Sequence, residues 1–310
     1  MAERRNFSFL SADGIHRIHG VTWSRKNDAK GVVQLTHGLG QYILLYDRFA
    51  RYLNLHGYHV IGHDHLGHGG SVVGPQEYGC FPVKEGWNLV NDDLRQVRER
   101  AARLWPGLPH FLLGHSMGSF QARTYLIRYP GTVDGCVLLG TGQEPRAALA
   151  LGLVLAKSLS RVAGANADAD LFSFLGMEKF NLPFRVTRTP ADWISRDKIA
   201  VKRFLEDPLC RALPTVGMYR DMLEGLMVIG SFDQLLKMDR STPIALFSGD
   251  MDPVGEFGKG VLKVYELLRE AGCTDVTMKL YPGARHELLS ETNKVEVQED
   301  ILAWLNAKVG

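Results

Sequence analysis

Hydrophobic residues along this chain form two kinds of run, which occur in turn. Short continuous apolar runs, typical of strands buried on both faces, lie at 31–36, 58–61, 110–113, 135–139, 243–247 and 276–281. Runs with apolar residues at helical spacing lie at 44–55, 89–104, 120–129, 258–270 and 295–307. Because strand, helix and strand in succession form a parallel unit, we expect an α/β fold whose mostly parallel sheet carries helices on both faces.

The strand-type runs are missing from the middle of the chain, where the pattern is helical or irregular, and they return afterwards. An all-helical stretch that interrupts such a sheet is placed most simply above the carboxyl edge of the strands. Open α/β sheets bind their ligands at that edge. We therefore expect residues 1–142 and 236–310 to form an α/β core, and residues 143–235 to form a helical cap.

The charges of the chain are balanced and scattered. Its 310 residues carry a formal net charge of +2 at pH 7, without a long basic or acidic run. Phosphate backbones bind clustered Lys and Arg, so we expect no nucleic-acid partner. The longest apolar stretch, 147–156, has ten residues, whereas a membrane-spanning helix needs about twenty. No signal-peptide core follows the N-terminus, and the four cysteines form no C-x-x-C pair, which favours reduced thiols in the cytoplasm.

A candidate nucleophile lies where one predicted strand passes directly into a helix. Residues 114–118, Gly-His-Ser-Met-Gly, fit the pattern G-x-S-x-G. A strand that feeds straight into a helix makes a sharp turn, and only glycine-sized residues two positions on either side let the two elements pass so closely. Such a turn lifts the Ser116 hydroxyl above the sheet. The alternative is an ordinary glycine-flanked loop with no chemistry.

The order of the polar residues favours the catalytic interpretation. In hydrolases with this motif the partners follow the nucleophile as acid and then histidine. Of the eleven histidines, only His286 follows Ser116, and it lies just beyond the last predicted strand. The preceding strand ends in two candidate acids, Asp250 and Asp252. We expect Asp252 to orient the imidazole because it lies farther into the loop, with Asp250 as the alternative.

Acyl transfer also needs donors for the negative charge that develops on the carbonyl oxygen. One predicted donor is the backbone N–H of Met117, directly after the nucleophile. The other is the N–H of Leu39, since the loop His37-Gly38-Leu39-Gly40 follows the strand run at 31–36. We expect His37 to hold this turn and not to take part in catalysis.

A histidine-rich loop offers a competing hypothesis. His63, Asp64, His65 and His68 lie within six positions, and such clusters can bind zinc. The four glycines of the same loop indicate a tight turn instead, in which Asp64 bonds nearby backbone N–H groups. A metal site also leaves the order Ser, Asp, His unexplained. We therefore expect neither a metal nor another cofactor.

Taken together, these motifs resemble the monoacylglycerol lipase and lysophospholipase-like group of α/β-hydrolases. The resemblance extends over nearly the whole chain and rests on HGLG at 37–40, DHLGHGGS at 64–71, GHSMG at 114–118, GDMDPV at 249–254 and PGARHELL at 282–289. The segments DWISRD at 192–197 and DPLC at 207–210 are similar to bacterial members. The resemblance implies the same triad and oxyanion donors. One departure is Gln41-Tyr42, where many relatives have an acidic residue and a histidine.

The cap is expected to select the acyl compound. Its stretch ALALGLVLA, at 148–156, is apolar on nearly all faces, which suits either a helix buried against the core or a lining for an acyl chain that also touches lipid. Further apolar residues of the cap are Phe172, Phe174, Leu175, Phe180 and Phe184. Together with the resemblance, this favours a small-molecule ester as substrate, such as a monoacylglycerol or a lysophospholipid, and a transient lipid contact. The oligomeric state stays open.

Two other functions fit parts of the pattern. An aminopeptidase or amidase could use the same triad, with Glu178, Asp192 or Glu206 of the cap holding a substrate ammonium. A non-catalytic binding protein could use the same scaffold. The intact set of nucleophile, base and acid argues against this last function, because a pure binder has no need for all three groups.

Overall fold

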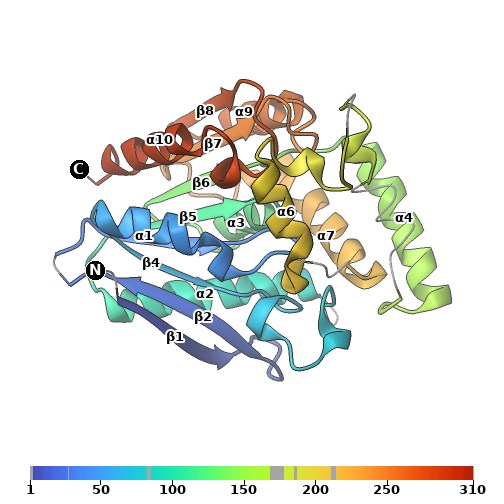
Figure 1. Cartoon of the computed structure of the whole chain (residues 1–310), viewed down its shortest axis with the longest axis horizontal. Coiled ribbons are helices and arrows are strands. Elements are labelled where there is room, and N and C mark those ends of the chain that lie inside the picture. Colours follow the sequence, from blue (N-terminus) through green and yellow to red (C-terminus); the bar gives the residue numbers. More distant parts are fainter. Residues whose placement is uncertain are drawn as a thin grey trace.

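An eight-stranded sheet runs through the centre of the molecule in the order β1-β2-β4-β3-β5-β6-β7-β8 (Figure 1). The computed structural model describes residues 3–26, 28–81, 85–167, 178–184, 187–210 and 214–309. The strands are β1 (Glu3–Leu10), β2 (Arg17–Ser24), β3 (Gly31–Thr36), β4 (Tyr58–His63), β5 (His110–His115), β6 (Gly135–Leu139), β7 (Ile244–Gly249) and β8 (Val276–Tyr281).

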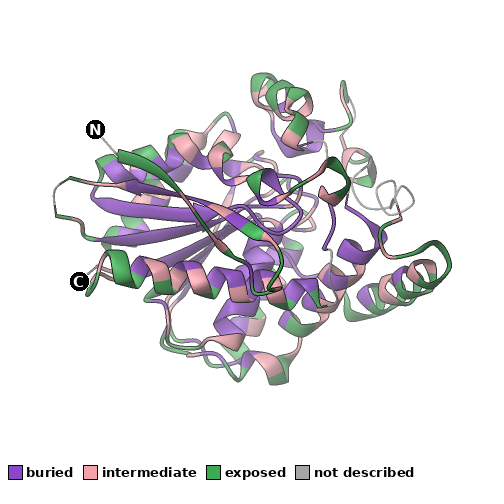
Figure 2. Ribbon diagram, turned by 90° about the horizontal axis from the view of Figure 1, so that it is seen from below, coloured by how far each residue is buried: buried purple, intermediate pink, exposed green. Residues whose placement is uncertain are grey.

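Six of these strands are parallel. β4, β3, β5, β6, β7 and β8 run in one direction, whereas β1 pairs antiparallel with β2, and β2 antiparallel with β4. β3 to β7 are buried at every position, as Figure 2 also shows. This burial explains their continuous apolar runs, because helices cover both faces of a parallel sheet.

Helices cover the two faces of the sheet as two separate layers. One layer consists of α1 (Asp47–Leu55) and α10 (Lys294–Asn306). The other consists of α2 (Gly86–Leu104), α3 (Met117–Arg128) and α9 (Lys259–Glu270). Successive strand residues alternate between the layers, so that neighbours such as Leu112 and Leu113 belong to different core clusters. The fold is therefore an α/β sandwich of three layers, as the sequence predicts.

The polypeptide between β6 and β7 holds only helical elements in its described part. They are α4 (Arg146–Ala163), η4 (Glu178–Asn181), η5 (Asp192–Ile194), α6 (Lys198–Glu206), η6 (Pro208–Cys210), α7 (Val216–Ile229) and α8 (Phe232–Leu235). They lie at the carboxyl end of the strands, and α4 extends to the edge of the molecule (Figure 1). Phe172, Phe174 and Leu175 lie outside the described residues. The division at residues 142 and 236 stays a prediction.

A buried arginine joins both ends of this cap to the helix that follows Ser116. The guanidinium of Arg123 donates to the carbonyl oxygens of Gly142 and Ile229 at 2.9 and 3.0 Å, and to Gln143 Oε1 at 2.9 Å. Burial lowers the pKa of Arg123 to about 9. Arg123 thus ties the start of the cap, the end of α7 and helix α3 to one point.

The remaining elements are short turns of 3-10 helix that connect the strands to the outer helices. They are η1 (Ile43–Tyr46), η2 (Gly69–Ser71), η3 (Pro75–Glu77) and η7 (Leu288–Ser290). All four cysteines are described; their side chains are buried, and none of them forms a disulfide. In the described ranges no helix has the length and apolar character needed to cross a bilayer.

Candidate active site

Ser116 lies in the sharp turn between β5 and α3. Its backbone has φ 53° and ψ −123°, a conformation that L-residues rarely adopt. The Ser116 N–H donates to the carbonyl oxygen of Leu139 on β6 at 2.9 Å, which holds the turn against the neighbouring strand. Ser116 is half-buried, whereas the residues before and after it are buried. The turn therefore presents this one side chain above the sheet.

The flanking glycines are required by the close passage of strand, helix and loop. A Cβ on Gly114 would lie 2.3 Å from the carbonyl oxygen of Gly118, and a Cβ on Gly118 would lie 2.2 Å from the carbonyl oxygen of Thr36. Both distances are far below van der Waals contact, and the atoms met are backbone atoms that cannot move aside. The motif thus encodes the turn physically.

The loops after β7 and β8 bring a carboxylate and an imidazole together. Asp252 Oδ2 lies 2.9 Å from His286 Nδ1, and both side chains are buried. Asp252 Oδ1 accepts the N–H of Val254 at 2.9 Å, which fixes the carboxylate. Asp250 instead accepts the N–H of Gly283 at 2.6 Å and so ties the two loops together.

Two opposing effects act on the pKa of His286, the predicted base. Burial lowers the pKa of His286, but the charge of Asp252, its hydrogen bond and the nearby Glu287 act more strongly in the other direction. The net result is a pKa raised above 6.5. The charged form of the His286 ring is therefore stabilised by its carboxylate partner.

The imidazole of His286 is packed between two other rings. The ring of His115, the residue before Ser116, lies 4.8 Å from it, and the indole of Trp193 from the cap lies 5.1 Å from it. Within the described residues the Ser116 hydroxyl makes no hydrogen bond, to His286 or to any other group. Catalytic hydrogen bonds are often long before substrate binds. Sequence reasoning assigned no role to Trp193, which it named only as part of the motif DWISRD.

The backbone N–H groups predicted as oxyanion donors have no acceptor within the described part of the chain. Among the described residues, neither Leu39 N–H nor Met117 N–H donates a hydrogen bond. The loop that carries Leu39 lies against Ser116, since a Cβ on Gly38 would lie 3.0 Å from Ser116 Cβ. His37 supports this loop: its Nδ1 lies 2.8 Å from the Gly38 carbonyl oxygen, and its Nε2 accepts the His65 N–H at 3.0 Å.

Gln41, where this chain departs from the family pattern, is hydrogen-bonded to the loop that carries Leu39. Gln41 Oε1 accepts the N–H of Gly38 and the hydroxyl of Tyr46, both at 2.8 Å. Its amide group donates to Glu287, the residue after the base. The adjacent Tyr42 hydroxyl donates to Asp207 of the cap at 2.7 Å. Sequence reasoning missed the role of Gln41 because its partner Glu287 lies in a distant segment of the chain.

The histidine-rich loop is organised around a carboxylate. Asp64 accepts the N–H groups of Ile43 at 2.6 Å and Gly70 at 2.8 Å, and its Oδ2 lies 2.8 Å from His19 Nδ1. Burial lowers the pKa of His63 to about 4. In the part of the chain that the structure describes, His, Cys, Asp and Glu form no group of three suited to a metal ion.

The family comparison agrees with this geometry. The model of the hydrolase family described as serine aminopeptidase, S33, matches residues 27–293. The chain belongs to this S33 family. This S33 hydrolase is 29% identical over 305 residues to a monoacylglycerol lipase of Mycolicibacterium smegmatis, covering 97% of both chains. It is 30% identical over 305 residues to the monoglyceride lipase of Homo sapiens, covering 96% of this chain and 89% of the human one.

Two solved structures have the same fold as this chain. A highly thermostable carboxyl esterase from Bacillus coagulans, crystallised in complex with glycerol, is similar with a TM-score of 0.92 at 29% identity over 100% of both chains. A structure described as a lipase in open form gives a TM-score of 0.89 at 25% identity. The S33 protein is therefore a serine hydrolase with the α/β-hydrolase fold, which confirms the predicted family and fold class.

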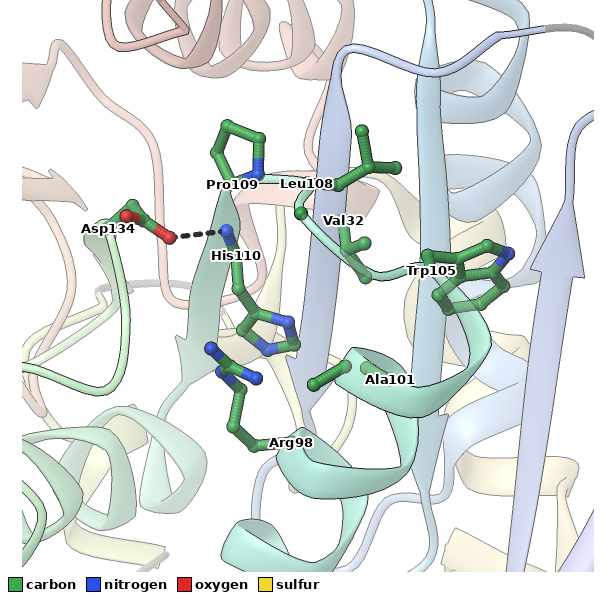
Figure 3. Close-up of a pocket in the computed structure, with 10 residues that line it drawn as sticks. Val32, Arg98, Ala101, Trp105, Leu108, Pro109, His110 and Asp134 are labelled. Atoms are coloured by element: carbon green, nitrogen blue, oxygen red, sulfur yellow. Dashed lines mark hydrogen bonds between the residues drawn. The ribbon is translucent and has the colours of Figure 1, made fainter.

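Two cavities of this S33 hydrolase lie at opposite ends of the sheet. The larger, about 730 Å³, is bordered by Gln41 and Glu287 and so adjoins the site. Its apolar wall is formed by Leu44, Leu45, Phe49, Ile194, Phe204 and Leu289. The smaller, about 290 Å³, lies at the start of β5, where Asp134 accepts the N–H of His110 at 2.7 Å (Figure 3). That cavity is remote from Ser116, which lies beyond the other end of β5.

Proposed function

We propose that this protein hydrolyses carboxylic monoesters of the monoacylglycerol or lysophospholipid type. In this proposal Ser116 is the nucleophile, His286 the base and Asp252 the acid. The observation that carries it is the 2.9 Å contact of Asp252 with His286, at the same sheet edge as a strained serine turn. Ser116, Asp252 and His286 follow the strands β5, β7 and β8 and so share one edge of the sheet, which supports the proposal.

The proposed reaction follows from these positions. Ser116 Oγ attacks the carbonyl carbon of the ester while His286 Nε2 takes the hydroxyl proton. The N–H groups of Leu39 and Met117 stabilise the oxyanion, and the imidazolium then gives its proton to the leaving alcohol. A water molecule, deprotonated by the same imidazole, attacks the acyl enzyme and releases the acid. Asp252 holds the ring and offsets its positive charge throughout.

The monoester substrate is supported by the relatives and by the site. The relatives from Mycolicibacterium smegmatis and Homo sapiens are named as monoacylglycerol and monoglyceride lipases. The cavity of about 730 Å³ beside Gln41 and Glu287 is within the range of small-molecule sites and has an apolar wall. Such a cavity suits a small amphiphile better than a large polar substrate.

We also propose that the cap, residues 143–235, makes transient contact with lipid through α4. This helix exposes a stripe of apolar side chains at helical spacing, namely Leu151, Val154, Leu155 and Val162. It lies at the right-hand edge of the molecule, where exposed residues predominate (Figure 2). The sequence allowed a helix buried against the core, and the exposed stripe favours the lipid contact. The four buried cysteines, none of which forms a disulfide, support the proposed cytoplasmic location.

An aminopeptidase or amidase remains the competing function, and the family description contains that word. Two of the acids considered for an ammonium site are engaged elsewhere. Asp192 accepts the N–H of Arg188 at 2.7 Å and the hydroxyl of Thr189 at 2.5 Å. Glu206 borders the larger cavity, but it is exposed and is paired with Lys202 at 3.7 Å. Neither arrangement favours recognition of a substrate amine.

Comparison of p-nitrophenyl esters of increasing chain length with aminoacyl p-nitroanilides tests the choice. We expect ester turnover to exceed anilide turnover by orders of magnitude, with a preference for medium or long acyl chains. The opposite ranking would assign an amidase. Labelling of Ser116 by a fluorophosphonate separates both enzymes from a pure binding protein, which would not react.

A further inference from the structure

The cap segment Asp192 to Asp197, here called the strap, lies along the loop that carries His286. Its residues meet residues 285–294 one after another and in the same order along both segments. At the start of the strap, the Asp192 carbonyl oxygen accepts from Arg285 Nη1, and the Trp193 ring packs on the His286 ring. In its middle, the Ile194 carbonyl oxygen accepts the Glu287 N–H at 2.8 Å, and Ser195 Oγ donates to the Ser290 carbonyl oxygen at 3.1 Å. At its end, Arg196 Nε donates to Glu291 Oε2 at 2.9 Å, and Asp197 Oδ2 accepts from Lys294 Nζ at 3.1 Å.

Glu291 is the most completely buried polar group of this contact. Its side chain is 0% exposed and receives donors from both segments. From the strap it accepts the backbone N–H and Nε–H of Arg196, both at 2.9 Å. From its own loop it accepts the N–H of Arg285 at 3.0 Å and the N–H of Thr292 at 2.8 Å. One carboxylate thus fixes the residue before the base to the cap.

The loop of His286 is held from two sides as a result. On the β8 side, Asp250 accepts the N–H of Gly283 at 2.6 Å. On the α10 side, Glu291 accepts the N–H of Arg285, and Arg196 Nη2 donates to Asn293 Oδ1 at 3.0 Å. Between these anchors the imidazole has the Trp193 ring against it. Without the strap, Glu291, which fixes the loop after Arg285, would lose its two hydrogen bonds from Arg196.

We propose that the strap positions the catalytic histidine, with Glu291 and Arg196 as its positioning residues. This inference rests on the proposed function, since it assumes that His286 is the base. In this proposal the strap is part of the active-site framework and stays in place during turnover.

The consequence for the reaction is geometric. Proton transfer requires the imidazole within hydrogen-bond reach of the Ser116 oxygen, and a displacement of about 1 Å can cost about 10²-fold in rate. The strap contributes Ile194 and Asp197 to the wall of the larger cavity, whereas Arg196 does not line it. Removing the contacts of the Arg196 side chain is therefore expected to lower kcat and to leave KM nearly unchanged.

Arg196→Met is the main variant, because it removes the guanidinium and keeps most of the apolar stem. We expect kcat per active site, titrated with a fluorophosphonate, to fall about 10-fold to 100-fold, with KM within about twofold. Arg196→Lys restores a cation opposite Glu291 and should recover most of kcat. Lys157→Met is the matched control, since it breaks the cap ion pair with Glu224 at 2.9 Å, which does not touch the strap. It should leave both constants unchanged.

Each outcome decides for or against the inference. If Arg196→Met lowers Tm but its titrated kcat equals that of the parent, the strap is only structural and the proposal is overturned. An equal fall in kcat for Lys157→Met also overturns it. Should Arg196→Met fail to fold, Ser195→Ala removes the hydrogen bond to Ser290 O and the local one from the Asp197 N–H. It is expected to lower kcat about threefold, and no change there rejects the proposal. Loss of ester turnover in the parent would instead contradict the proposed function itself.

Discussion

Asp252→Asn tests the proposed acid, because it replaces a single carboxylate oxygen by an NH₂ group. Asp252 Oδ1 accepts the Val254 N–H at 2.9 Å, and Oδ2 lies 2.9 Å from His286 Nδ1. In the variant, the amide oxygen has to stay with the Val254 N–H, because an NH₂ group there would face another donor. The NH₂ group then points at His286 Nδ1 and donates to it. The ring proton is consequently forced onto Nε2.

The magnitude follows from this change of tautomer. An Nε2 that already carries a proton cannot accept one from Ser116, so the variant loses its general base. The same exchange in a serine protease triad lowers kcat about 10⁴-fold, or about 5 kcal/mol of activation free energy. We expect a loss of that order for Asp252→Asn. Asp250→Asn keeps an oxygen for the Gly283 N–H and should cost less than about tenfold.

The assay is the hydrolysis of a p-nitrophenyl ester, with Tm measured for each variant to establish that it is folded. Fluorophosphonate labelling of Asp252→Asn should slow in step with kcat, since both reactions need an activated Ser116. The reasoning is refuted if Asp250→Asn loses more activity than Asp252→Asn. It is also refuted if folded Asp252→Asn keeps more than about a tenth of the parent rate.

The remaining predictions concern the nucleophile, the base and the buried histidines. Ser116→Ala should abolish ester turnover and probe labelling with little change in Tm, and residual turnover above about 0.1% would point to another nucleophile. Because the pKa of His286 is raised, the acid limb of kcat/KM should lie above pH 6.5, and a limb below pH 6 contradicts the pairing with Asp252. Burial lowers the pKa of His37 to about 3 and of His63 to about 4, so the unfolded state binds protons first as pH falls below 6.5. Urea unfolding should therefore show about 3 kcal/mol less stability per histidine at pH 4 than at pH 7, and an unchanged midpoint would exclude this.

The nucleophile turn could be predicted from sequence because its causes are local. Gly114 and Gly118 are needed by backbone atoms within the turn and one adjacent strand, and the pattern G-x-S-x-G records that need directly. The order of Ser116 and His286 along the chain reflects the strand order of a parallel sheet, which apolar runs already indicate. Helix ends were less accurate: the helix predicted from residue 120 begins at Met117, since its first turn is made of motif residues without apolar periodicity.

The strap could not be predicted in the same way. Arg196 and Glu291 are 95 positions apart, and their contact depends on how the cap folds back over the core. A buried carboxylate has no sequence pattern of its own, because it is identified only by the donors around it. The same applies to Trp193, whose contact with the His286 ring requires both loops to be in place.

Gln41 shows why a departure from a family pattern has to be interpreted together with its spatial partner. Its carbonyl oxygen accepts from Gly38 and Tyr46, which an acidic residue could also do, but its NH₂ group donates to Glu287. A carboxylate at position 41 would place two negative charges within hydrogen-bond distance of each other, and this repulsion would raise the pKa of one of them. Burial and Glu287 both raise the pKa of Tyr46, which keeps its hydroxyl protonated as a donor. The amide at 41 and the carboxylate at 287 therefore form one unit with a single negative charge beneath the oxyanion loop.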